Sequence, residues 1–251
     1  MKTMNLKSKA ITVLLCTMLV FSFSIFASAE TNGDIAGINK SGETYGTYFS
    51  EGGVPDLIAA VATNGKSGYI KQVDLDGKIP DNPKDALELQ KNQKSRVIPV
   101  YKEDGTTVIG GFVISKAEEK GETLVTNATK SAQSNEKTFS VGSRTYYNFA
   151  RIALDTSNGS ATSTVKLGIK SGTSVPAGYL GVMAFVTKYT GKEVVAATEM
   201  KYNSSDHCSS YITSASYKTK SGTYYAWGRT HVWNGEKYVL QTTLNSPNQN
   251  F

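Results

Sequence analysis

The residues with the clearest potential for chemistry lie on one face of a predicted β-hairpin near the C-terminus. The Asn234-Gly235 pair predicts a two-residue turn, which sets Trp233 opposite Glu236 and His231 opposite Tyr238. Because side chains alternate along a strand, every second residue shares this face. Its candidate binding residues are Tyr225, Trp227, Arg229, His231, Trp233 and Tyr238. Aromatic rings around a cationic side chain are typical of surfaces that contact glycans or proteins.

The opposite face of the same strand carries mostly smaller residues, such as Ala226, Gly228 and Val232. If these residues pack inward, the aromatic face is exposed and forms a binding surface. If the aromatic face packs inward instead, Arg229 and His231 need buried partners. The sequence leaves both arrangements open.

A thiol-based active site is the main enzymatic alternative. It would use Cys208 as nucleophile with His207 or His231 as base, and the chain has only these two histidines. Thiol catalysis requires a base within hydrogen-bond reach of the sulfur. The polar loop at 203–210 matches no catalytic signature. We therefore assign no catalytic residue and expect a protein that is not an enzyme.

The sequence also predicts no metal and no cofactor. Histidines and cysteine lack the spacing of a zinc site. The stretch from Asp74 to Gly77 resembles the start of a calcium loop, but the later ligands are missing. No glycine-rich phosphate loop or dinucleotide fingerprint is present.

The N-terminus predicts a secretory signal peptide over residues 1–29. A lysine-containing start precedes an apolar run at 10–26, and Ala27 and Ala29 occupy the positions that a signal peptidase reads. Cleavage is expected before Glu30, and an uncleaved membrane anchor is the alternative. The formal net charge of +6 includes three lysines of this segment, so the mature chain carries about +3. That charge is too small to favour nucleic acid and allows only weak attraction to anionic cell-wall polymers. After Ala29, no apolar run is long enough to cross a bilayer, so no stable membrane span is expected once the signal is removed.

The mature chain is predicted to contain two modules joined by a polar linker at 118–137. The first, at 30–117, is expected to be a small α+β module, with a short helix at 54–61, a strand at 67–71, a capped helix from Asn82 to about residue 93, and a hairpin of 97–101 with 107–114. The second, at 138–251, is expected to be an all-β antiparallel sandwich of about seven strands. Its strands are predicted at 146–155, 162–169, 179–189, 194–202, 211–217, 223–233 and 237–243.

Short motifs in the first module resemble a known extracellular module. They are Gly-Glu-Thr-Tyr-Gly at 42–46, Val-Pro-Asp-Leu-Ile at 54–58, Gly-Tyr-Ile at 68–70, Ile-Pro-Val-Tyr at 98–101 and Asp-Gly-Thr-Thr-Val-Ile-Gly at 104–110. Together they resemble an uncharacterised accessory module of secreted and membrane-attached proteins in Gram-positive bacteria. The resemblance implies an extracellular accessory domain and carries over no catalytic residue.

Motifs in the second module resemble the small secreted β-sandwich proteins of the lactococcin 972 type. They are Val-Pro-Ala-Gly-Tyr-Leu-Gly at 175–181, the Tyr202-Asn203 pair, and Tyr-Tyr-Ala-Trp-Gly at 224–228. The sequence as a whole predicts a secreted, non-enzymatic binding protein at a bacterial cell surface or wall, with a cell-wall glycan or a surface protein as partner. A secreted antibacterial or toxin-like effector is the alternative, followed by a thiol hydrolase using Cys208.

Overall fold

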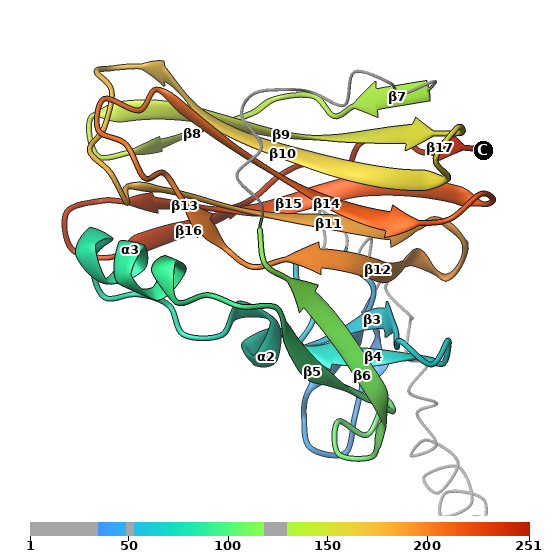
Figure 1. Cartoon of the computed structure of the whole chain (residues 1–251). Coiled ribbons are helices and arrows are strands. Elements are labelled where there is room, and N and C mark those ends of the chain that lie inside the picture. The colour runs from blue at the N-terminus through green and yellow to red at the C-terminus, as the bar shows by residue number, and fades with distance from the viewer. Residues whose placement is uncertain (1–34, 49–52, 118–129) are drawn as a thin grey trace, which may run out of the picture. The chain divides into compact units, whose positions relative to one another are not determined.

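The computed structural model describes residues 35–48, 53–117 and 130–251, and consists mainly of β-strands (Figure 1). The predicted signal peptide, with Ala27 and Ala29, lies outside these residues. The strands of the first half are β1 (Ile35–Ile38), β2 (Thr44–Gly46), β3 (Leu57–Val61), β4 (Ser67–Lys71), β5 (Arg96–Tyr101) and β6 (Val108–Ser115). Two short α-helices, α2 (Gln72–Asp76) and α3 (Pro83–Lys91), lie between β4 and β5.

The second half contains the longer strands and one 3-10 turn, η1 (Thr190–Lys192). These strands are β7 (Lys130–Gln133), β8 (Lys137–Val141), β9 (Arg144–Asp155), β10 (Ser160–Ser171), β11 (Leu180–Lys188), β12 (Glu193–Thr198), β13 (Lys201–Tyr202), β14 (Ser210–Lys218), β15 (Thr223–Trp233), β16 (Tyr238–Thr242) and β17 (Gln249–Asn250). Strand β7 occupies part of the predicted 118–137 linker, and residues 118–129 lie outside the described chain.

One twelve-stranded sheet runs through both halves of the chain. Its order is β1-β2-β3-β4-β5-β6-β12-β11-β15-β16, with β13 on β11 and β17 on β15. Strand β12 also pairs in parallel with β3, at Val194 and Ala60, and with β6, at Ala197 and Ile114. These contacts close β3, β4, β5, β6 and β12 into a five-stranded barrel, so a strand from the second half completes the barrel of the first.

The predicted fold class, a small α+β module followed by a seven-stranded sandwich, is therefore wrong. The structure is mostly β throughout, and its main sheet crosses the predicted boundary. The physical reason is that β12 forms backbone pairs along both of its edges. One pairs with β11 in an ordinary hairpin, and the other pairs with β3 and β6, which are remote in sequence. Period-two patterns show that a strand exists but do not show which strand it pairs with.

Local predictions in the first half had mixed outcomes. The helix predicted at 54–61 is wrong, because β3 occupies this stretch and Leu57, Ile58 and Ala60 are completely buried in it. Burial on both faces of a sheet overrides the helix propensity of the alanines. The helix predicted from Asn82 is confirmed as α3, where the Asn82 side chain accepts a hydrogen bond from the Asp85 backbone N–H at 3.0 Å.

The second sheet has the order β14-β10-β9-β7, with β8 paired to β9 (Figure 1). Between it and the large sheet lies a core of mostly small aliphatic residues, which we call the inter-sheet core; it includes Val165, Val182 and Ala226. A second core, which we call the junction core, joins the barrel interior to the other side of β11 and β15. It contains larger side chains, including Phe185 and Trp227. Strands β11 and β15 are thus buried on both faces.

The hairpin of β15 and β16 has a longer loop than predicted. Trp233 pairs with Tyr238, and His231 with Leu240, so the predicted register is wrong. The Asn234 side chain accepts hydrogen bonds from the backbone N–H groups of Glu236 and Lys237, at 2.9 and 2.8 Å. Asparagine commonly stabilises turns in this way. Here the loop has four residues, 234–237, instead of the predicted two.

Candidate functional site

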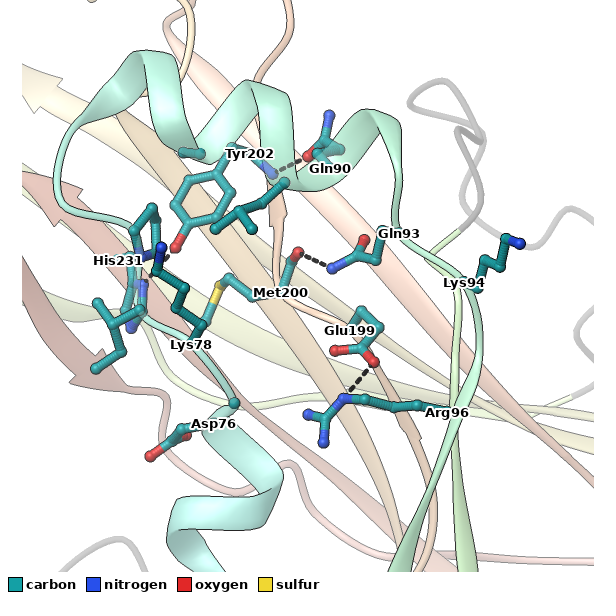
Figure 2. A pocket seen from close by; sticks show the side chains of 15 residues that line it. Asp76, Lys78, Gln90, Gln93, Lys94, Arg96, Glu199, Met200, Tyr202 and His231 are labelled. Atoms are coloured by element: carbon teal, nitrogen blue, oxygen red, sulfur yellow. Dashed lines mark hydrogen bonds and ion pairs between the residues drawn. The ribbon is translucent and has the colours of Figure 1, made fainter.

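A pocket of about 240 Å³ lies beside helix α3 (Figure 2). The helix and the loop that follows α2 form one wall, and the segment from Glu199 to Tyr202 forms the other. His231, on β15, also lines it. Apolar groups from Ile79, Leu89 and Met200 make up much of the surface between the polar residues. The pocket therefore depends on elements from both halves of the chain.

Two glutamines hold α3 against the opposite wall. The Gln90 side-chain oxygen accepts a hydrogen bond from the Tyr202 backbone N–H at 2.6 Å, and the Gln93 Nε2 donates to the Met200 carbonyl at 3.1 Å (Figure 2). Gln90 lies in the last turn of α3 and Gln93 lies just beyond its end at Lys91, so both are close to the segment that the helix covers. These contacts leave the Gln90 NH₂ group and the Gln93 oxygen available to a further partner.

An ion pair closes one end of the pocket. Arg96 Nε lies 2.6 Å from Glu199 Oε1, and Arg96 Nη2 donates to the Leu75 carbonyl at 2.8 Å. Burial raises the pKa of Glu199, and the Arg96 charge partly offsets this effect. Because Arg96 also binds the end of α2, this pair connects β5, α2 and the Glu199 segment. Its groups are already engaged with each other.

The deep part of the pocket is electrically neutral. The Tyr202 hydroxyl lies 2.9 Å from His231 Nδ1. Burial, together with the nearby Arg229 charge, lowers the pKa of His231 to about 4, while burial raises the pKa of Tyr202. At neutral pH the imidazole is therefore uncharged, and its Nδ1 shares one hydrogen bond with the phenol.

A buried cation lies behind this site. Arg229 has no exposed surface, and its Nη1 is paired with Asp76 Oδ1, on α2. The guanidinium carbon also lies 6.0 Å from the Trp227 ring. Asp76 lines the pocket, so its carboxylate is shared between the pocket wall and the buried guanidinium. The Arg229 Nε and Nη2 atoms have no hydrogen-bond partner within the described chain.

The structure buries most of the predicted aromatic face. The exposed fractions of Tyr225, Trp227, Arg229 and His231 are 6%, 0%, 0% and 5%. Trp227 is stacked between Tyr48 and Phe185, with ring centroids 3.7 and 3.9 Å away. Its indole N–H donates to Thr187 Oγ1 at 2.9 Å. The smaller face of β15 is also buried, in the inter-sheet core, so burying one face does not expose the other.

Trp233 and Tyr238 keep partial exposure. The Tyr238 ring lies 5.1 Å from those of both Trp233 and Tyr202, and its hydroxyl donates to the Gly178 carbonyl at 2.6 Å. Of the six predicted binding residues, His231 is the one that lines the pocket beside α3.

The groups considered for thiol or metal chemistry do not form a site. Cys208 packs against the inter-sheet core, and its Sγ donates to the Ser210 carbonyl at 3.1 Å. His231 lies on the face of β15 that points away from the inter-sheet core, and His207 is exposed. Burial raises the pKa of the Cys208 thiol. Among the described residues, no three His, Cys, Asp or Glu side chains are grouped to hold a metal ion. The aspartates of the suspected calcium loop lie in α2.

Sequence reasoning missed most of the pocket residues. Gln90 lies on a helix that the sequence predicts and Gln93 just beyond its observed end, but nothing local distinguishes them from solvated polar residues. Their role depends on the segment that α3 covers, more than a hundred positions further along the chain.

Comparisons with known proteins identify no relative. No family model matches the chain, and searches of curated proteins and of solved structures give no match. In the part of the chain that the structure covers, no helix has both the length and the apolar character needed to cross a membrane.

Proposed function

We propose that this chain is a secreted, non-enzymatic binding protein that acts at the surface or in the wall of a Gram-positive bacterium. The pocket beside α3 is its ligand site, and a short peptide segment, from a surface protein or from the wall itself, is the ligand class that its chemistry fits best. The signal-peptide pattern at 1–29 supports the extracellular location.

Binding explains the pocket better than catalysis does. A general base works best when its pKa is close to the operating pH and it can reach the proton that it removes. The pKa of His231 is too low for this role, and its Nδ1 is already engaged in a hydrogen bond with the Tyr202 hydroxyl. Glu199 is engaged with Arg96. Cys208 belongs to the other core.

The observation that carries the proposal is the pair of tethered glutamines. Gln90 retains an amide donor and Gln93 a carbonyl acceptor, and a peptide unit presents one group complementary to each. Leu89 and Met200 offer apolar surface for a ligand side chain. The exposed Lys78 on the rim would attract a ligand carboxylate. A preformed, largely apolar pocket with a few oriented polar groups is the usual form of a small-ligand site.

The test is a screen of fluorescein-labelled tetrapeptides with free carboxylates, measured by fluorescence anisotropy on the chain from Glu30 to Phe251. We expect a subset to bind with dissociation constants below about 1 mM. Leu89→Trp, which fills the pocket from the half-exposed side of α3, should weaken binding at least about tenfold. Lys84→Trp, outside the pocket on the same helix, is the matched control. Absence of binding to the wild-type chain, or equal binding by both variants, would contradict the peptide assignment.

The extracellular location has its own test. Mass spectrometry of protein recovered from culture medium and washed cell walls should show an N-terminus at Glu30. Recovery of a chain that begins at Met1, in the membrane fraction alone, would contradict secretion.

A further inference from the structure

A second pocket, of about 260 Å³, lies away from α3 and shares no residue with the first. It is lined by Tyr189, Lys192, Tyr225, Asn245, Ser246 and Asn248. These residues come from the turn after β11, the beginning of β15 and the segment between β16 and β17. The lining combines tyrosine, amide, hydroxyl and lysine side chains and contains no carboxylate.

The segment that carries Asn245 is held rigidly against β15. Thr243 pairs with Gly228 twice, since its backbone N–H donates to the Gly228 carbonyl and its Oγ1 accepts from the Gly228 N–H, both at 2.9 Å. Ser246 pairs with Ala226 in the same way, again at 2.9 Å for both contacts. Residues 244 and 245 therefore lie between two fixed points, and the position of Asn245 is preorganised.

Asn245 presents an acceptor that the chain does not use. Its Oδ1 is buried and has no hydrogen-bond partner among the described residues. A buried polar atom without a partner is unfavourable, and in native proteins it calls for an explanation. Because Asn245 also lines the pocket, a hydrogen-bond donor on a ligand that reaches this atom would satisfy it.

Tyr189 provides the complementary apolar surface. Its side chain is 53% exposed, although its backbone N–H is bound to the Thr223 carbonyl at 2.8 Å. The face of an aromatic ring carries partial negative charge, which attracts the weakly positive C–H groups of a sugar ring. An aromatic ring beside amide groups thus offers both kinds of contact that a neutral sugar makes.

We propose that this second pocket binds a neutral sugar, with its ring packed on Tyr189 and a hydroxyl or acetamido N–H donated to Asn245 Oδ1. Asn248, which is exposed on the rim, adds an amide for the remaining hydroxyls. The proposal shares the extracellular location with the proposed function, but it does not depend on the pocket beside α3. It gives the chain a glycan contact that is separate from its peptide contact.

The experiment is calorimetric titration of the chain from Glu30 to Phe251 with chitotriose, and with cellotriose as the analogue that lacks acetamido groups. Asn245→Ala and Tyr189→Ala should each weaken binding by about tenfold or more, whereas Tyr189→Phe should stay within about threefold of wild type because it keeps the ring. Tighter binding of chitotriose identifies the acetamido group as the donor to Asn245, and equal binding of the two sugars identifies a hydroxyl. Both results support the site.

Two controls separate this proposal from the first. Asn135→Ala, an exposed asparagine beside the other sheet, and Leu89→Trp, in the peptide pocket, should bind sugar like the wild type. Melting curves of each variant show whether a loss of binding reflects unfolding. The Tyr189 side chain is exposed and belongs to neither of the two cores. Absence of binding of either sugar at about 10 mM, or wild-type affinity in folded Asn245→Ala and Tyr189→Ala, would overturn the proposal. A failure of peptide binding would leave it intact.

Discussion

The two faces of strand β15 contribute to cores of different kinds. On one face, Ala226 and Val232 enter the inter-sheet core, where two sheets approach closely and small side chains fill the space. On the other face, Trp227 and Arg229 enter the junction core, where a sheet meets a barrel. A barrel cannot lie flat on a sheet, and large side chains fill the remaining space. The alternation of small and large side chains along β15 therefore matches the different spaces on its two sides.

The polar contacts of the two regions differ in the same way. Beside the inter-sheet core, the neutral Asn148 side chain donates to Thr230 Oγ1 at 2.9 Å. Beside the junction core, a buried guanidinium pairs with Asp76 and a neutral histidine with Tyr202. A buried ion pair and a buried neutral histidine therefore lie where the two halves of the chain meet. Stability and ligand binding should respond most strongly to changes there.

The largest expected effect is that of Trp227→Ala in the junction core. The substitution removes a completely buried ring from between Tyr48 and Phe185 and leaves a cavity. It should lower the free energy of unfolding by about 3–5 kcal/mol, measured by denaturant titration. Trp233→Ala, on the same face but partly exposed, is the control and should cost less. Equal losses in the two variants would contradict the described packing.

A smaller loss is expected from Asp76→Ala, which leaves the buried Arg229 without its partner. Because Asp76 keeps 19% side-chain exposure, we expect about 3 kcal/mol, the lower end of the range for broken buried pairs. The double variant Asp76→Ala/Arg229→Met should recover much of this loss, since it removes both charges. Asp81→Ala, an exposed aspartate nearby, should melt like the wild type. A double variant less stable than Asp76→Ala alone would show that Arg229 has another partner.

Because His231 is buried as a neutral imidazole, the free energy of unfolding should depend on pH. We expect this effect to be no larger than the loss in Asp76→Ala. Its pKa is about 4 in the folded chain and 6.5 in the unfolded chain, so unfolding takes up a proton between these values. The resulting stability is fully present above pH 6.5 and is lost as the pH falls to 4, up to about 3 kcal/mol. Glu199 acts in the opposite sense, since its raised pKa favours the folded state at low pH.

Comparison with His231→Gln isolates the histidine contribution, because Glu199 is present in both proteins. The difference in unfolding free energy between wild type and variant, measured from pH 7 to pH 4, should shrink as the pH falls. A constant difference would mean that His231 is not buried as a neutral imidazole.

The smallest of the four effects tests the inter-sheet core. A Cβ atom at Gly228 would lie 2.4 Å from a Val165 methyl carbon and 2.7 Å from the Met183 carbonyl oxygen. Gly228→Ala should therefore cost about 1–3 kcal/mol through overpacking. At Gly111 the added atom would meet the exposed Val97 side chain, which can move, so Gly111→Ala is the milder control. If Gly228→Ala cost nothing, the sheets would be further apart than described.

The sequence by itself determined the elements that depend on local interactions. Helix α3 begins where Asn82 and Pro83 predict it, because capping involves residues within one turn. The hairpin of β5 and β6 forms where the sequence predicts it, since both strands and their turn are adjacent in the chain. Alternation along β15 correctly grouped Trp227, Arg229 and His231 on one face.

Only the tertiary structure decided what covers that face. Strand β12 pairs with β3 and β6 across more than eighty positions, and no local pattern encodes such a pairing. That contact brings the barrel onto β11 and β15, buries the aromatic face, and converts the stretch at 57–61 from a predicted helix into a central strand. The pocket beside α3 is also a product of the tertiary structure, because its two walls come from segments more than a hundred positions apart in the chain. Hydrophobic burial is non-directional, so the sequence specifies which side chains avoid water but not which surface covers them.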